Sequence, residues 1–341
     1  MNALVWEGPR LMNVRELPEP KPAADEVLIK VAFSGICGSE LSGYLGHNTL
    51  RVPPLVMGHE FSGEIKALGA RATEINPKLA IGARVTVNPL IYDPLSRASR
   101  RGRPNLCRQR QIIGIHRPGS YAGYVTAPAL NVHRLPDGTS LERAALTEPL
   151  ACAVQAVQLS GCTPADIVLI TGLGPIGLLA LIAARNFGVQ RLYATDTDPD
   201  RRAIGEKFGA RVLDPKQTRV VELIQKETDG EGVDVAIDAV GAAATRRECL
   251  ESVMRGGRVV FVGLHDEESP VQANLIARSE ITVQGSFAFT TRNFETALDW
   301  LATGRVEIDP WLVKAPLAEG QACFERLLGK PGPVAKILLQ S

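Results

Sequence analysis

The stretch from Asp166 to Gly188 constrains the fold more than any other part of the chain. "DIVLIT" is an apolar run of strand length, and "PIGLLALIAARNFG" has the length of a helix and ends at a glycine. Between them lie Gly172, Gly174 and Gly177 with G-x-G-x-x-G spacing. A strand, a glycine-rich turn and a helix in this order predict a parallel β–α unit with a tight turn.

The same alternation continues to about residue 286. "RLYATD" predicts a second strand and "PDRRAIGEKFGA" a second helix, and "VDVAIDAVG", "RVVFVGL" and "ITVQGSF" predict further strands separated by helical stretches. Repeated alternation of this kind predicts an α/β fold with a doubly wound parallel sheet. Beyond it, "NFETALDWLATG" predicts a helix and "VAKILLQ" a closing strand.

The first half of the chain has a different pattern. Runs such as "EVLIKVAFSGIC", "FSGEIKALG" and "GARVTVNPL" are short, rich in strand formers and ended by Gly or Pro, and no long helical period appears before about Leu141. Closely spaced short strands predict a partly closed barrel or a sandwich. The 341 residues are enough for two domains with cores of their own.

Charge and composition exclude several classes of protein. Lys plus Arg is 38 and Asp plus Glu is 37, so the charge gives no reason to expect nucleic acid or an anionic membrane as a partner. The longest apolar run is too short to span a bilayer, and the N-terminus lacks the apolar segment of a secretory signal. Six scattered cysteines do not suggest a disulfide scaffold. We therefore expect a cytoplasmic protein.

The glycine turn predicts a dinucleotide site because its context fits. The spacing alone is weak, since an ordinary strand–turn–helix connection also uses glycines, but Asp196 closes the next strand 24 residues after Gly172. Gly172 would permit the tight turn, Gly174 the approach of the pyrophosphate, and Gly177 close packing of helix and strand. The helix start at residues Pro175 and Ile176 would face the phosphates.

The acidic residue bears on which nicotinamide cofactor binds. Asp196 would accept hydrogen bonds from the ribose hydroxyls, and its charge would repel a 2′-phosphate, so the sequence predicts NAD over NADP. Arg201 and Arg202 follow closely, and a nearby Arg can accommodate that phosphate. We expect both arginines to be solvent-exposed charged residues on a helix, and we keep Arg201 as a candidate for cofactor binding.

Four residues offer zinc-ligand chemistry. Cys37 lies in "SGICGSE", His59 and Glu60 in "VMGHEFSGEI", and Glu148 in "LTEPLACA". A catalytic zinc needs three such protein ligands and one open position. A lone Cys is more often core filler and a lone His–Glu pair a surface pair, so the case rests on the whole set, with each residue beside Gly or Pro at a turn.

These segments together resemble a known family. "GICGSE", "GHEFSGEI", "EPLACA" and "TGLGPIG", in this order and at these separations, resemble the zinc-dependent medium-chain dehydrogenase/reductase (alcohol dehydrogenase) family. "GSFAFTTRNFETALDWLATGRVEI" resembles its polyol (sorbitol-type) dehydrogenase branch, to which sugar-alcohol-phosphate and threonine dehydrogenases are near relatives. The resemblance implies a GroES-like β-rich catalytic domain (1–151), an NAD-binding Rossmann domain (152–286), a return segment completing the catalytic domain (287–341), and a cleft between the two domains.

The resemblance also implies an activity. It is the reversible, NAD-linked oxidation of a secondary alcohol, a polyol or sugar alcohol, to a ketone, by a dimer or tetramer of identical chains. A sugar-alcohol phosphate (galactitol-phosphate-like), butanediol or threonine is the alternative substrate. A zinc-free reductase of the quinone-reductase type and a non-enzymatic scaffold are further alternatives, against which the presence of Cys37, His59 and Glu148 argues.

Individual roles follow from the same resemblance. Cys37 and His59 are expected to bind one catalytic zinc per chain. Glu60 is a ligand in some members of the branch and a partner of a ligand in others. Glu148 takes the place of a cysteine of other alcohol dehydrogenases and is expected to contact the zinc or its water. Ser39 is expected to bond the substrate oxygen and to pass on its proton.

Two positions depart from the family pattern. Glu40 stands where the family usually has Asp, and if it orients His59, its extra methylene requires a shifted backbone or a water. Ser42 stands where many relatives have a His that relays protons, so the relay would use water or His47, which is as readily a plain loop residue.

The segment "DPLSRASRRGRPNLC" corresponds to the lobe that holds a structural zinc in many members. At the four cysteine positions it carries Asp93, Ser96, Ser99 and Cys107, and serine hydroxyls are poor zinc ligands, so we expect no structural zinc. Its four arginines favour a solvated face, with a phosphate-binding patch as the alternative. Our hypothesis is that this lobe is a subunit contact. The four arginines of the lobe are Arg97, Arg100, Arg101 and Arg103.

Overall fold

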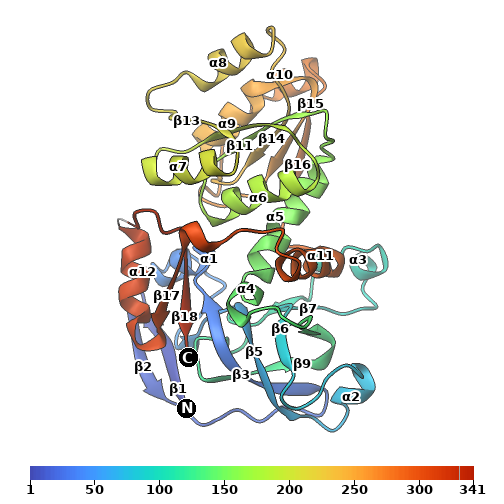
Figure 1. The fold of residues 1–341 in the computed structure, drawn as a ribbon, viewed down its shortest axis with the longest axis vertical. Coiled ribbons are helices and arrows are strands. Elements are labelled where there is room, and N and C mark those ends of the chain that lie inside the picture. The colour runs from blue at the N-terminus through green and yellow to red at the C-terminus, as the bar shows by residue number, and fades with distance from the viewer. Residues whose placement is uncertain (330) are drawn as a thin grey trace. The chain divides into compact units, whose positions relative to one another are not determined.

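The computed structural model describes residues 1–329 and 331–341, and its contacts divide the chain into two compact units (Figure 1). The first unit comprises residues 1–149 and 290–341, and the second comprises residues 150–289. The division falls inside helix α5 (Thr147–Ser160) and at the N-cap of helix α11 (Thr291–Ala302).

The first unit is built mainly from strands, as its sequence predicts. One sheet has the order β10-β6-β5-β3-β18-β17 with β9 paired to β3, a second has the order β2-β1-β4, and β7 pairs with β8. The strands are β1 (Asn2–Gly8), β2 (Leu11–Glu16), β3 (Glu26–Gly35), β4 (Leu55–Val56), β5 (Glu60–Leu68), β6 (Arg84–Val87), β7 (Leu90–Ile91), β8 (Gln111–Ile112), β9 (Tyr124–Pro128), β10 (Val132–Arg134), β17 (Leu312–Pro316) and β18 (Lys336–Gln340).

Short helices connect these strands, and the last strand returns to the first unit. The helices are α1 (Gly38–Tyr44), α2 (Ala72–Ile75), α3 (Arg97–Arg100), α4 (Leu141–Ala144), α11 and α12 (Gly320–Leu328). β18 pairs antiparallel with β3, with Leu338 opposite Gly35, so the predicted closing strand is confirmed (Figure 1). Aromatic residues fill the core beneath it, and Tyr44 and Phe324 pack with ring centroids 5.2 Å apart.

The second unit has a parallel sheet of the order β13-β12-β11-β14-β15-β16 in the described residues. This is the strand order of a Rossmann domain, so the predicted fold class is confirmed. The strands are β11 (Ile167–Thr171), β12 (Arg191–Thr195), β13 (Arg211–Leu213), β14 (Val233–Asp238), β15 (Val253–Phe261) and β16 (Thr282–Gly285). The helices are α6 (Pro175–Asn186), α7 (Pro199–Lys207), α8 (Val220–Glu227), α9 (Ala243–Ser252) and α10 (Ala273–Arg278).

The glycines between β11 and α6 are required for different steric reasons. Gly172 has a φ of +84°, which is the left-handed region that favours glycine. A Cβ on Gly177 would lie 1.7 Å from the Gly172 carbonyl oxygen, so helix and turn pack backbone to backbone there. Gly174 has an ordinary φ of −66°, and a Cβ there would meet only Arg201 Nη1, at 3.9 Å.

This difference predicts the stability of two alanine variants. Gly177→Ala should lower the free energy of unfolding by about 3 kcal/mol, because the methyl group must displace backbone. Gly174→Ala should change it by less than about 0.5 kcal/mol, because its methyl group fits. Urea unfolding of the cofactor-free protein, followed by circular dichroism, measures both, and equal stability of the two variants would contradict the packing described here.

Candidate active site

Strand pairing brings the candidate metal ligands together. β3 and β5 are antiparallel neighbours with Gly35 opposite Glu60, and Cys37 follows the end of β3 while His59 precedes the start of β5. The ligand atoms of Cys37, His59 and Glu60 all lie within 4.8 Å of one another. In the described part of the chain this is the one group of three or more side chains placed to hold a metal ion.

Glu40 connects the two turns that carry Cys37 and His59. As the third residue of α1, its Oε2 accepts a hydrogen bond from the Cys37 amide at 3.0 Å. Its Oε1 accepts from the Gly58 amide at 2.8 Å and from His59 Nδ1 at 2.9 Å. Tyr121 donates its hydroxyl proton to Oε2 as well. The extra methylene of Glu therefore lets the carboxylate reach His59 directly, without the intervening water that the sequence left open.

The same contacts fix the charge of this carboxylate. Burial raises the pKa of Glu40, but the charge and hydrogen bond of His59 outweigh burial, and the pKa falls to about 2. Burial lowers the pKa of His59, and Glu40 followed by Cys37 outweigh it, so the His59 pKa lies well above its usual value. Because Nδ1 donates to Glu40, Nε2 of His59 is the nitrogen left to bind a metal.

Glu60 is paired with a buried lysine. Lys336 Nζ donates to the two carboxylate oxygens at 2.8 and 2.6 Å and to the Ile36 carbonyl at 3.0 Å. Lys336 is the first residue of β18, and both charged groups are buried. Burial lowers the pKa of Lys336, and Glu60 outweighs it. Lys336 is not among the residues predicted from the sequence, although a lysine inside the apolar run "VAKILLQ" is a signal that could indicate it.

Glu148 lies near this group without belonging to it. It is the second residue of α5, and 8% of it is exposed. Burial, and then the neighbouring carboxylates Glu60 and Glu40, raise its pKa to about 7 against the opposing charges of His59 and Lys336. Of the two candidate carboxylates, the structure therefore places Glu60 beside Cys37 and His59.

Ser39 lies between the Cys37 thiol and Arg51, an arginine that the sequence did not predict to be part of the site. Its hydroxyl donates to Cys37 Sγ at 3.4 Å and accepts a hydrogen bond from Arg51 Nη2 at 3.2 Å. Arg51 is 3% exposed and follows α1 in the chain. His47, the proposed relay residue, is exposed, and its amide donates to the Ser42 carbonyl.

The nucleotide turn has its own hydrogen bonds. Asp196 follows β12, and its Oδ2 accepts a hydrogen bond from the Leu173 amide at 2.7 Å, so its carboxylate lies at the glycine turn. Arg202 forms an ion pair with Asp214, with an N–O distance of 3.1 Å. Arg201 lies close to Gly174, and its Nε has no partner among the described residues. Pro175 and Ile176 begin α6, as the motif predicts.

Hydrogen bonds of serine hydroxyl groups stabilise the lobe at residues 93–107. Ser96 Oγ lies 2.9 Å from Ser99 Oγ, and Ser99 Oγ donates to the Asp93 carbonyl at 2.7 Å. A hydrogen bond from Ser96 lowers the pKa of the buried Cys107 thiol, ahead of the opposing effect of burial. The four positions therefore lie together and are connected by hydrogen bonds.

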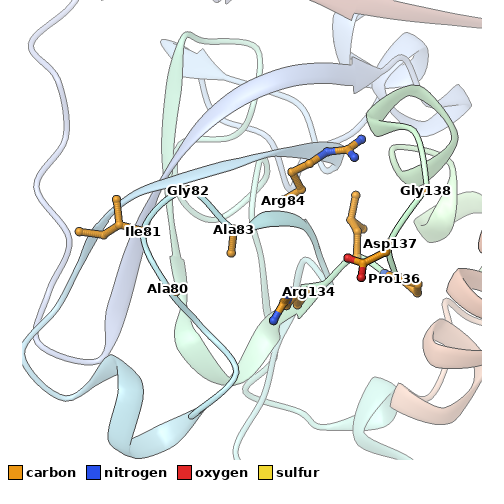
Figure 2. A pocket seen from close by; sticks show the side chains of 10 residues that line it. Ala80, Ile81, Gly82, Ala83, Arg84, Arg134, Pro136, Asp137 and Gly138 are labelled. Carbon is orange, nitrogen blue, oxygen red and sulfur yellow. The ribbon is translucent and has the colours of Figure 1, made fainter.

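One surface cavity lies apart from the candidate metal ligands. A cavity of about 360 Å³ is lined by residues 80–84 and 134–138, and none of the predicted site residues lines it (Figure 2). Within the described ranges, no helix combines the length and the apolar character needed to cross a bilayer.

Comparison with known proteins agrees with this arrangement. The family model described as alcohol dehydrogenase GroES-like domain matches residues 23–137, and the one described as zinc-binding dehydrogenase matches residues 175–303. A sorbitol dehydrogenase from Bacillus subtilis (strain 168) is 32% identical over 347 residues, which cover 99% of this chain and 97% of that protein. The chain belongs to the zinc-dependent medium-chain alcohol dehydrogenase family. It is an oxidoreductase.

Other members of the alcohol dehydrogenase family are equally similar. A D-arabitol-phosphate dehydrogenase from Enterococcus avium is 35% identical over 332 residues, with coverage of 96% of this chain and 93% of that protein. A solved structure from Sinorhizobium meliloti 1021, assigned to the zinc-binding dehydrogenases and bound to NADP, superimposes with a TM-score of 0.91 at 32% identity, covering 100% of this chain and 99% of that one.

The position of Glu40 in this dehydrogenase predicts its effect on metal binding. Glu40→Gln should weaken zinc binding by about 10- to 100-fold, because the amide cannot accept all four hydrogen bonds and removes the charge beside His59. Competition with a chromogenic chelator measures the affinity. Glu222→Gln, at an exposed carboxylate of the second unit, is the matched control and should bind zinc like the unchanged protein. Equal affinity of the two variants would rule out the role of Glu40.

Proposed function

We propose that this protein catalyses the reversible, NAD-linked oxidation of a secondary alcohol, a polyol or sugar alcohol, to a ketone at a single catalytic zinc. The observation that supports this most is the group of Cys37, His59 and Glu60. A thiolate, an imidazole and a carboxylate are suitable zinc ligands, and three of them leave a fourth position for the substrate oxygen. Glu148, whose pKa is raised to about 7 by burial, is proposed to lie beside that position.

The chemistry divides between the bound groups and the chain. When bound, zinc supplies a Lewis acid for the substrate oxygen, and the nicotinamide accepts the hydride. Ser39, which lies beside Cys37, is proposed to relay the proton: its Oγ takes the proton of the substrate hydroxyl as it releases its own proton to water. Glu148, with a pKa near 7, can hold a proton at its carboxyl group close to neutral pH. Lys336 and Glu40 keep Glu60 and His59 in place.

The substrate class has an alternative with specific support. Similarity to the D-arabitol-phosphate dehydrogenase of Enterococcus avium supports a sugar-alcohol phosphate, while similarity to the Bacillus subtilis sorbitol dehydrogenase supports an unphosphorylated polyol. Butanediol and threonine are named substrates of further relatives at 31% and 34% identity. Membership of the zinc-dependent family argues against the zinc-free reductase and the non-enzymatic scaffold.

The finer details of cofactor and assembly are also proposals. We favour NAD because the Asp196 carboxylate lies at the glycine turn, although a similar structure binds NADP and Arg201 lies near Gly174. We propose one zinc per chain, with no zinc in the lobe, because two of its four positions are serines. The exposed leucines of the lobe, Leu95 and Leu106, support a subunit contact there in a cytoplasmic dimer or tetramer.

Substitution of the thiol tests the metal assignment. Cys37→Ser should reduce the zinc content from about one per chain towards zero and abolish turnover, because a hydroxyl is a poor zinc ligand. The Kd for NAD, measured by fluorescence titration of the reduced cofactor, should change by less than about twofold. Cys162→Ser, at a half-buried thiol of the second unit, is the control. Full zinc content and turnover in Cys37→Ser would refute the proposed function.

Substitution of the acidic residue tests the cofactor. Asp196→Ala should raise the Kd for NAD about 10-fold and leave that for NADP equal or lower, because the variant loses a ribose acceptor and a repulsive charge. Asp200→Ala, at an exposed position four residues later, is the matched control. An unchanged ratio of the two dissociation constants would show that Asp196 does not select the cofactor.

A further inference from the structure

Arg51 is a buried cation beside the proposed reaction site. Its Nη2 donates to Ser39 Oγ at 3.2 Å, and Ser39 in turn lies 3.4 Å from Cys37 Sγ. The side chain reaches this position across Gly43, where an added Cβ would lie 2.6 Å from Arg51 Cδ. A group bound beside Ser39 would therefore lie within reach of the guanidinium.

The charge of Arg51 acts on the nearby Glu40 and helps to lower its pKa, but the two side chains form no direct ion pair. Within the described residues, the buried Nε and Nη1 have no hydrogen-bond partner and Arg51 forms no ion pair. Nε carries one N–H and Nη1 carries two, so most donors of the guanidinium lack an acceptor. The nearby Glu40 already accepts hydrogen bonds from four other groups. Native structures rarely leave a buried charged group in this state, and Nη2, beside Ser39, is the nitrogen at which an acceptor from outside the chain would meet the guanidinium.

We propose that Arg51 determines substrate specificity by binding an oxyanion of the substrate, so that among secondary alcohols with several hydroxyl groups the enzyme prefers those that also carry a carboxylate. This inference rests on the proposed function, because it places the substrate hydroxyl beside Ser39. A carboxylate fits the planar fork of a guanidinium. A phosphate ester offers the same oxyanion chemistry, but its second negative charge would meet Glu40 and the Cys37 thiolate, so the carboxylate is favoured.

The test uses three ligands that differ at one terminal carbon. L-Galactonate carries a carboxylate, galactitol a hydroxymethyl group, and galactitol 1-phosphate a phosphate ester. Their affinities for the zinc-loaded, full-length protein are measured by isothermal titration calorimetry, which does not depend on turnover. We expect L-galactonate to bind about 10- to 100-fold more tightly than galactitol. Arg51→Gln should remove that difference and change the affinity for galactitol by less than about threefold.

Further variants separate specificity from folding. Arg51→Lys retains the charge without the fork and should keep part of the preference. Gly43→Ala, which displaces the Arg51 side chain, should reduce the preference even if Arg51→Gln does not fold. Arg103→Gln, at another arginine whose Nε lacks a partner in the described structure, should leave it unchanged. Thermal unfolding of each variant verifies the fold.

The outcomes are distinct. Tighter binding of galactitol 1-phosphate than of L-galactonate, lost in Arg51→Gln, would support the oxyanion site and identify phosphate as its source. Equal affinity for galactitol and both anions, no detectable binding of either anion, or an equal loss for all three ligands in Arg51→Gln would overturn the proposal. If the unchanged protein bound no zinc or oxidised no alcohol, that result would instead contradict the proposed function. The two failures are therefore distinguishable.

Discussion

The buried carboxylate of Glu40 is the contact on which the site depends. It accepts hydrogen bonds from the Cys37 amide, the Gly58 amide, His59 Nδ1 and the Tyr121 hydroxyl, so one anion fixes both turns that carry the proposed metal ligands. An unpaired carboxylate would be costly at this depth, and four donors together offset that cost. The longer side chain of Glu is suited to this role because, at the third position of α1, it reaches back to the helix start as well as across to the imidazole.

A second buried charge ties the end of the chain to the same place. Lys336, in β18, donates to both oxygens of Glu60 in β5, although 276 residues separate them. A metal bound by Cys37, His59 and Glu60 would therefore compete with Lys336 for the Glu60 carboxylate. When no metal is bound, the hydrogen bonds from Lys336 keep the carboxylate oriented, and they make the C-terminal strand part of the site.

Local patterns in the sequence predict what depends on neighbours along the chain. The glycine turn, Asp196 and the alternation of strands and helices could be read from residues 166–286, because a β–α unit forms from contiguous segments. The metal group was predicted from residue type and resemblance. Lys336, Arg51 and Tyr121 were not, because their partners lie on distant segments and a lone polar residue carries no local signal. The geometry of Glu40 could not be predicted either, because it depends on tertiary contacts. In the structure the Glu40 carboxylate bonds His59 directly, without a bridging water.

X-ray absorption at the zinc edge would measure the metal centre in the unmodified protein, because it counts ligands by element. Binding by Cys37, His59 and Glu60 predicts a single kind of site with one sulfur at about 2.3 Å and nitrogen or oxygen ligands at about 2.0 to 2.2 Å. A site with four sulfur ligands, or a protein that binds no zinc at all, would contradict it.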